Sequence, residues 1–287
     1  MDTQSILKKR VDFIIEESLL SKNDEDVFLH LLVISDSVKS LIGINVEAPP
    51  LNLLDWIERE VKMSDKKDSP IKFQKPEIRT VSYKQLQEAL INRDRKLIEN
   101  ILLSLQSVTD GTQLSEFLLE MSLLQTGKSF ISVWRIYKAM NFINLDDNFP
   151  FYRLMCEVIL KDHFREESIN NKKPNYLVAA KYLNMLIYSH ILDCRSCLFI
   201  RQRKVLAALD GMLSYITLEN KIKNSISLHQ DSERKDRGSV LNKIENNNLK
   251  LSKKNILLLD SIRMLIKNAP KVNDELIFSM YEQLKDT

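Results

Sequence analysis

Glycine and proline are scarce in this chain, which has only five glycines and seven prolines among 287 residues. A β-sandwich or a β-barrel needs many tight turns, and those turns draw heavily on these two residue types. Leucine, isoleucine, lysine, glutamate and asparagine are abundant instead. The composition therefore disfavours an all-β fold and favours helices.

The chain is also poor in cysteine and in long apolar runs. Its three cysteines are an odd number, which argues against a disulfide scaffold and for a reducing compartment. No stretch reaches the ~18 uninterrupted apolar residues of a membrane span. The N-terminal segment MDTQSILKKRVDFIIEES has charges within its apolar run, so it predicts an amphipathic helix and no secretory signal. We expect a cytoplasmic protein without membrane contact.

Recognisable catalytic motifs are missing as well. The sequence contains no G-x-x-x-x-G-K-[ST], G-x-G-x-x-G, H-E-x-x-H or G-x-S-x-G pattern. A helical di-iron site needs Glu-x-x-His pairs, but Glu157 is followed three residues later by Leu160. These absences disfavour an enzyme.

The net charge is only +3, but the charge is unevenly distributed. Residues 1–63 hold 7 basic and 12 acidic residues (7 − 12 = −5), whereas residues 199–287 hold 16 and 11 (16 − 11 = +5). A basic C-terminal part could face an acidic partner such as nucleic acid. The same imbalance also fits an ordinary solvated surface.

Apolar residues recur at helical spacing over most of the chain. Residues 1–62 predict an N-terminal helical unit, and residues 63–80, with two prolines, four lysines and almost no periodicity, predict a linker. Residues 81–287 predict a larger bundle of short helices, interrupted by a polar, mobile insertion at 229–239. We expect an all-α multi-helix bundle of antiparallel helix pairs, and the linker leaves open an arrangement as two helical subdomains. No repeat of fixed period is present.

The longest predicted helix runs from Asn175 to about Thr217 and contains the segment SHILDCRSC. In a helix, His190, Cys194 and Cys197 would share one face, because they are separated by four and three residues. Free cysteine is among the most buried residue types, so the first interpretation is core packing. A redox pair would need a cysteine at a helix N-terminus, which this spacing does not provide.

A metal site is the alternative interpretation of the same segment. Thiolate and imidazole are zinc ligands, and Cys156 or His163, seven residues apart on the preceding predicted helix, could supply a fourth ligand. A straight helix seldom completes a tetrahedron by itself, because the ligand pairs of structural zinc sites come from tight turns. The sequence thus leaves two possibilities open: no cofactor, or zinc held by residues of this set.

The second half of the chain has a pattern of its own, with EVILKDHFREES, KKPNYLVAAKYLNML, CRSCLFIRQRKVLAAL and LKLSKKNILLLDSIRMLIKN in order. Over residues 150–268 this order resembles the helical domain of subunits of the GINS replication complex. In that family a long helix carries an Arg-x-x-Lys-Ile/Val element, and here Arg201, Arg203, Lys204 and Val205 match it. The family usually adds a small β-rich domain, for which this chain has no evident strands, and residues 1–148 lie outside the resemblance.

These observations favour a non-catalytic interaction or scaffold protein. The resemblance implies an accessory subunit of a nucleic-acid-processing, replication-type assembly with protein partners. Arg201, Arg203 and Lys204 are the candidate residues for contact with phosphate or an acidic partner. The same side chains could instead form salt bridges to neighbouring helices. The alternative function is a helical metal-binding protein or metalloenzyme using Cys156, His163, His190, Cys194 and Cys197.

Overall fold

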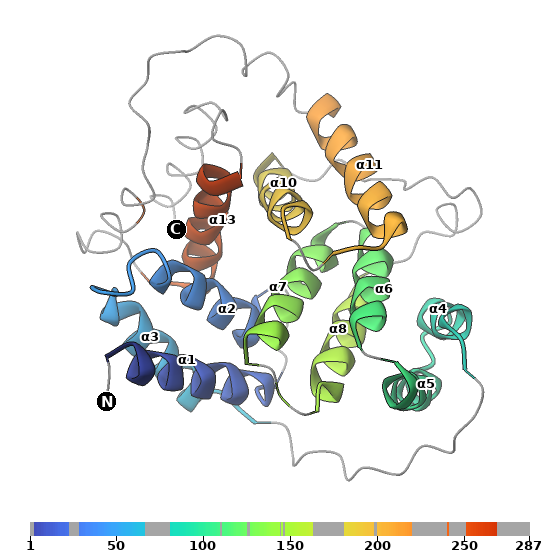
Figure 1. Cartoon of the computed structure of the whole chain (residues 1–287), viewed down its shortest axis with the longest axis horizontal. Coiled ribbons are helices and arrows are strands. Elements are labelled where there is room, and N and C mark those ends of the chain that lie inside the picture. Colours follow the sequence, from blue (N-terminus) through green and yellow to red (C-terminus); the bar gives the residue numbers. More distant parts are fainter. Residues whose placement is uncertain are drawn as a thin grey trace.

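A computed structural model of the chain confirms the helical prediction (Figure 1). Within the residues that the structure describes there are eleven α-helices and no β-strand, although an isolated antiparallel bridge joins Ser21 and Lys66. The fold is an all-α multi-helix bundle. The described residues are 3–22, 29–66, 81–109, 111–124, 127–143, 145, 147–162, 181–197, 200–219, 240 and 251–268.

The N-terminal part consists of three helices: α1 (Thr3–Leu19), α2 (Leu31–Ile42) and α3 (Leu51–Met63). α2 begins after His30, whose ring nitrogen Nδ1 accepts a hydrogen bond from the amide of Leu32 at 3.1 Å. It ends at Gly43, whose amide donates to the carbonyl of Lys39 at 3.0 Å. His30 is buried. A buried imidazole therefore takes the capping role that Ser, Thr, Asp or Asn usually fills.

The middle of the chain forms five separate helices, as the short predicted units indicate. Ser82 and Gln85 form a capping box at the start of α4, with amide-to-side-chain distances of 3.3 and 2.8 Å. Asp94 caps α5 through the amide of Leu97 at 3.0 Å. Gly111 precedes α6 with a φ of +80°, which glycine adopts without strain. The helices are α4 (Tyr83–Ile91), α5 (Arg95–Val108), α6 (Thr112–Leu123), α7 (Lys128–Ile143) and α8 (Phe149–Lys161).

The single long helix predicted from Asn175 to Thr217 is wrong. Where the structure describes this run, it forms two helices, α10 (Lys181–Arg195) and α11 (Arg203–Glu219). The hydroxyl of Ser196 donates to the carbonyl of Asp193 at 2.8 Å at the end of α10. Neither glycine nor proline marks the turn, so the local sequence gives no sign of it. A tertiary contact with α6 fixes the start of α11.

The last described helix, α13 (Lys253–Asn268), begins after Ser252, whose hydroxyl accepts from the amide of Asn255 at 3.2 Å. The predicted insertion at 229–239 lies outside the described residues. So does most of the predicted linker, from 67 to 80.

One hydrophobic core joins the helices on both sides of that linker. α2 packs against α1 and α3, and also against α7 and α13. α7 lies near the middle of the bundle in Figure 1 and contacts α6, α8 and α10 as well. The N-terminal unit predicted for residues 1–62 therefore shares its core with the helices of the bundle predicted for 81–287.

Candidate partner-binding site

The start of α11 is held in place by a buried carboxylate from α6. Glu116 accepts a hydrogen bond from the amide of Arg201 at 3.0 Å and another from the amide of Gln202 at 2.8 Å. Amides at a helix N-terminus lack intrahelical acceptors, and a negative charge there also complements the helix dipole. The segment before α11 has no capping side chain of its own, and Glu116 of α6 supplies the cap instead. This contact sets where α11 begins.

The predicted binding residues lie together at this helix start, and all three are exposed. Arg201, Arg203 and Lys204 face solvent, whereas Val205, the next residue, is fully buried. Neither Arg201 nor Arg203 forms an ion pair with any residue in the described ranges. The salt-bridge interpretation of these two arginines therefore finds no support among the described residues, and their charges are available to a partner.

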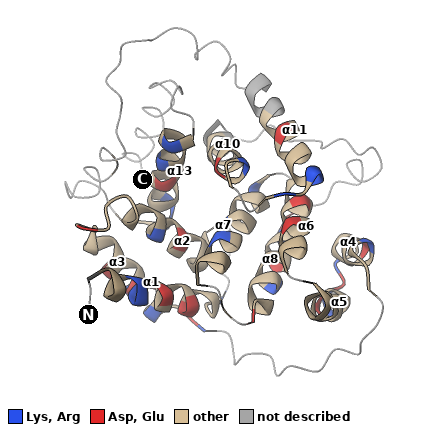
Figure 2. Ribbon diagram, in the orientation of Figure 1, with Lys and Arg blue, Asp and Glu red and all other residues tan. Residues whose placement is uncertain are grey.

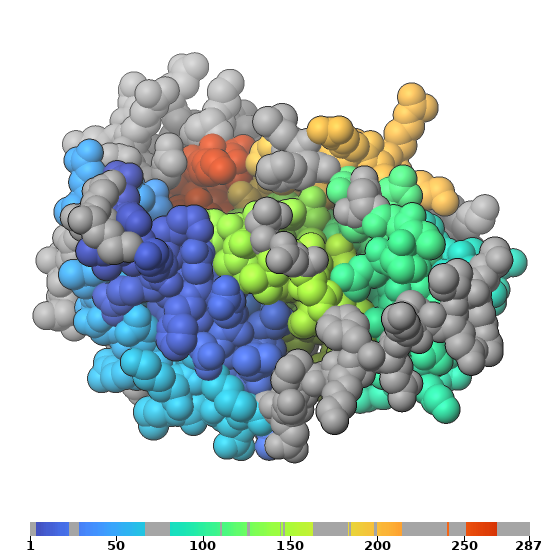
Figure 3. Space-filling model, turned by 60° about the horizontal axis from the view of Figure 1, so that its bottom comes forward, coloured from blue at the N-terminus to red at the C-terminus, as the bar shows by residue number. Residues whose placement is uncertain are grey.

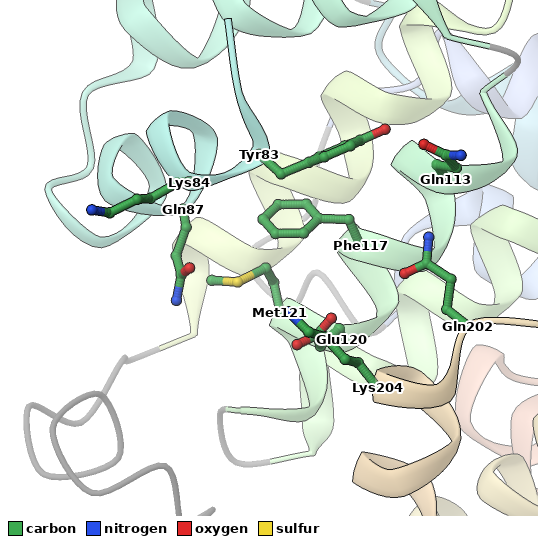
Figure 4. A pocket seen from close by; sticks show the side chains of 9 residues that line it. All are labelled: Tyr83, Lys84, Gln87, Gln113, Phe117, Glu120, Met121, Gln202 and Lys204. Atoms are coloured by element: carbon green, nitrogen blue, oxygen red, sulfur yellow. The ribbon is translucent and has the colours of Figure 1, made fainter.

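A pocket of about 310 Å³ opens beside this basic segment, between α4, α6 and the start of α11 (Figure 4). Its wall combines aromatic rings, amide side chains and charges. The lining residues are Tyr83, Lys84, Gln87, Gln113, Phe117, Glu120, Met121, Gln202 and Lys204. Gln202 and Lys204 belong to the pocket and to the basic segment, so the two features form one continuous site.

Two aromatic rings form the apolar part of the pocket wall. The ring centroids of Tyr83 and Phe117 are 5.1 Å apart, with 38° between the ring planes. Both side chains are partly exposed. Figure 4 shows Phe117 next to Met121, with Tyr83 reaching toward Gln113. A planar group entering the pocket would meet ring faces on one side and amide donors and acceptors on the others.

The charges of the pocket are mixed. Partial burial raises the pKa of the Glu120 carboxyl, and the nearby Lys204 ammonium opposes that shift. Lys84 lies at the opposite side of the pocket, where its ammonium is 3.8 Å from the exposed carboxylate of Glu88. An exposed pair at that distance contributes little, so Lys84 can turn toward a bound anion.

His190, a candidate zinc ligand, belongs instead to a buried polar network. Its Nε2 accepts a hydrogen bond from Nε of Arg135 at 3.0 Å, and its Nδ1 donates to the carbonyl of Leu186 at 2.7 Å. Both ring nitrogens are therefore engaged. Burial, followed by the positive charge of Arg135, lowers the pKa of His190 to about 3, so the ring is neutral.

The three cysteines of the candidate zinc set differ in how exposed they are. Cys156 on α8 and Cys194 in the last turn of α10 are buried, and burial raises the pKa of both thiols. Cys197 follows the end of α10 and is partly exposed. The prediction that His190, Cys194 and Cys197 share one helical face is thus wrong for Cys197, because the helix ends before it.

No group of three or more His, Cys, Asp or Glu side chains suited to a metal ion occurs among the described residues. The remaining candidate ligand, His163, lies outside them. Among the described residues, Cys194 and Cys156 are therefore core residues, and no zinc site is assembled.

The most extensive polar feature of the structure is a buried ionic network that the sequence pattern does not reveal. Arg135 on α7 is fully buried and pairs with Asp36 on α2, at 3.1 Å from Nη1 to Oδ2, and with Asp260 on α13. Figure 2 shows acidic residues on α2, α10 and α13 and basic residues on α7. Since a buried charge is costly without partners, this network fixes how four helices meet.

Further contacts extend the network to the edge of the bundle. Asp193 on α10 accepts from the indole nitrogen of Trp134 at 3.1 Å, from Lys138 at 2.9 Å and from Asn268 at 3.2 Å. Burial by itself would raise the pKa of the Asp193 carboxyl, but the charge of Lys138 and its hydrogen bond lower it. The only signal in the sequence is a lone charge inside each of three apolar runs, LLVISDSV, FISVWRIY and ILLLDSI.

No protein-family model, curated protein or solved structure matches this chain. Among the described helices, none combines the length and the apolar character that crossing a bilayer requires. The site at the start of α11 is therefore interpreted from its own geometry and chemistry.

Proposed function

We propose that this protein is a non-catalytic interaction or scaffold protein, an accessory subunit of a nucleic-acid-processing assembly. It contacts nucleic acid through the start of α11 and the adjoining pocket, and it contacts protein neighbours through other helix surfaces. One observation carries the proposal: the exposed cations Arg201, Arg203 and Lys204 border a pocket that contains aromatic rings. The three free cysteines support a reducing, cytoplasmic location.

The chemistry of the site suits an unpaired strand better than a duplex. Proteins that bind single strands combine cations that follow the phosphates with aromatic rings on which bases stack. Arg203 and Lys204 supply the first element, and Tyr83 and Phe117 the second. Gln87, which also lines the pocket, offers an amide group for the edge of a base.

The resemblance to GINS subunits supports the replication setting of this proposal. The matching basic element is Arg201, Arg203, Lys204 and Val205, and in this chain it opens α11 with its charges outward and Val205 in the core. The element therefore has the two properties that a contact segment needs. Its side chains are free to reach a partner, and its backbone is fixed to the bundle.

A direct test is binding of a fluorescent 20-nucleotide single strand to the full chain, followed by anisotropy at rising salt. Replacing Arg201, Arg203 and Lys204 by glutamine is expected to weaken binding at least tenfold and to flatten the salt dependence. The matched control, Arg95→Gln, Lys96→Gln and Lys254→Gln, removes the same charge from other exposed positions. It is expected to leave the affinity within about twofold.

The pocket is tested separately with Phe117→Leu, which keeps an apolar side chain but removes the ring. Loss of one stacked base is expected to weaken binding by roughly tenfold, since stacking on an aromatic side chain contributes ~1–3 kcal/mol. The salt dependence should not change. Absence of any binding at low salt, or an equal loss in the control triple variant, contradicts the proposed function.

A further inference from the structure

The helix α1 has a second apolar face, directed at solvent. Ile6, Phe13 and Leu20 are 48%, 47% and 40% exposed, and they recur every seven residues along one side of the helix and its end. The opposite side of α1 is already buried in the core through Ile14 and Ile15. Figure 3 shows α1, in dark blue, on the outer face of the molecule.

This arrangement differs from that of an ordinary surface helix, which is apolar on one side and polar on the other. Seven residues are nearly two helical turns, so Ile6, Phe13 and Leu20 lie on one side of the helix. Phe13 falls about half a turn from Ile15, so the two apolar sides of α1 lie almost opposite each other. Scattered exposed apolar residues need no explanation, but a row along one face is typical of a contact surface.

Two exposed charges of opposite sign lie along the same row. Lys9 is one turn before Phe13, and Glu16 is about one turn after it. Neither side chain forms an ion pair with any part of the chain that the structure describes. The row thus reads apolar, basic, apolar, acidic, apolar from Ile6 to Leu20, and its charges reverse about Phe13.

We propose that α1 pairs with α1 of a second copy of this chain, in antiparallel orientation, around a two-fold axis at Phe13. The axis places Phe13 against Phe13 and Ile6 against Leu20 of the other copy. The same axis brings Lys9 to within about one residue, ~1.5 Å along the helix, of Glu16 of the other copy, and does so twice. A two-fold interface must be self-complementary, and this charge order meets that condition.

The charges also select the orientation. A parallel pair of α1 helices would bring Lys9 to Lys9 and Glu16 to Glu16, and like charges in contact are unfavourable. An antiparallel pair replaces both repulsions by attractions. Contact between one helix and one helix gives a small interface, so we expect a weak dimer with a dissociation constant on the order of 10–100 µM.

Sedimentation velocity of the full chain between about 5 and 200 µM tests the proposal. The wild-type protein is expected to shift from monomer to dimer across this range, and Phe13→Glu is expected to remain monomeric. Because Phe13 faces solvent, its replacement should leave the thermal unfolding midpoint nearly unchanged. A wild-type protein that stays monomeric at 200 µM, or a Phe13→Glu protein that still dimerises, overturns the proposal.

Charge reversal decides the orientation independently of the apolar row. Lys9→Glu alone and Glu16→Lys alone should each weaken the dimer at least fivefold, since each creates like pairs. Mixing the two single variants should restore association, because a mixed antiparallel pair matches every charge again. In a parallel pair each residue would face its own copy, so either single variant would keep two like pairs and would dimerise as the wild type does. Single variants that dimerise as tightly as the wild type, or a mixture that fails to associate, refute the proposed geometry.

Discussion

Arg135 and His190 form a hydrogen bond of 3.0 Å between α7 and α10, and both side chains are fully buried. The guanidinium donates to Nε2 of the ring, so the imidazole must be neutral to accept. This single contact removes His190 from the list of available metal ligands and makes it part of the packing of the bundle. It also makes the stability of the fold depend on pH.

The first prediction concerns the stability of the fold at low pH. The folded His190 has a pKa of about 3, below its ordinary value of 6.5, so the unfolded chain binds a proton that the folded chain does not. Stability therefore falls as the pH falls from about 6.5 towards 3, with about 2 kcal/mol lost between pH 7 and 5. Urea unfolding at pH 7, 6 and 5 measures this loss.

The carboxylates of the network respond at lower pH, which separates them from His190. Burial would raise the pKa of Asp36, but the charges of Lys39, Lys138 and Arg135 lower it to about 2. Its stabilising contribution is present above pH 3.8 and is lost below, towards pH 2. Because Asp36 loses its contribution only below pH 3.8, the loss of stability between pH 7 and 5 comes from His190. In a His190→Gln protein, the free energy of unfolding should therefore depend much less on pH between 7 and 5. An unchanged dependence in that variant refutes the prediction.

The second prediction concerns the centre of the network. Arg135→Met removes the cation but leaves Asp36 and Asp260 buried without it, so we expect a loss of about 3–5 kcal/mol in the free energy of unfolding. Arg153→Met is the matched control, since the Arg153 pair with Glu99 at 3.0 Å is partly exposed. That variant should lose less than about 1 kcal/mol. Urea unfolding measures both losses. Equal losses of unfolding free energy in the two variants would show that the buried network stabilises the fold no more than an exposed ion pair does.

The third prediction concerns the thiols. Cys197 is partly exposed, whereas Cys156 and Cys194 are buried and their thiol pKa values are raised. An aromatic disulfide reagent at neutral pH should therefore label one thiol rapidly and the other two only on unfolding. Cys197→Ser should remove the rapid phase, and Cys194→Ser should keep it. Rapid labelling that survives Cys197→Ser would place a second thiol at the surface.

The fourth prediction concerns the cap on α11. Glu116→Gln keeps the size of the side chain but loses its charge and one of two acceptor oxygens, so one amide loses its partner. We expect destabilisation by about 1 kcal/mol and faster hydrogen exchange at the amides of Arg201 and Gln202. Glu120→Gln, on the same helix, should leave that exchange unchanged. Protection that is equal in both variants would mean that Glu116 does not hold the helix start.

Several features of this protein were predictable from local sequence. Ser82 with Gln85, Asp94 and Ser252 start helices where the sequence indicates, because a capping side chain bonds to amides only two or three residues away. The core-packing interpretation of the segment SHILDCRSC likewise predicts a buried Cys194.

The remaining features depend on partners far apart in the chain. The break before α11 needs Glu116, and the neutral His190 needs Arg135, which lies 55 residues away. The pairing of Arg135 with Asp36 spans 99 residues. The starts of α4, α5 and α13 and the apolar faces are set by neighbours within one turn, so the sequence alone determined them. Buried charges and the end of a helix without glycine or proline depend on which helices meet, and only the tertiary structure decided those.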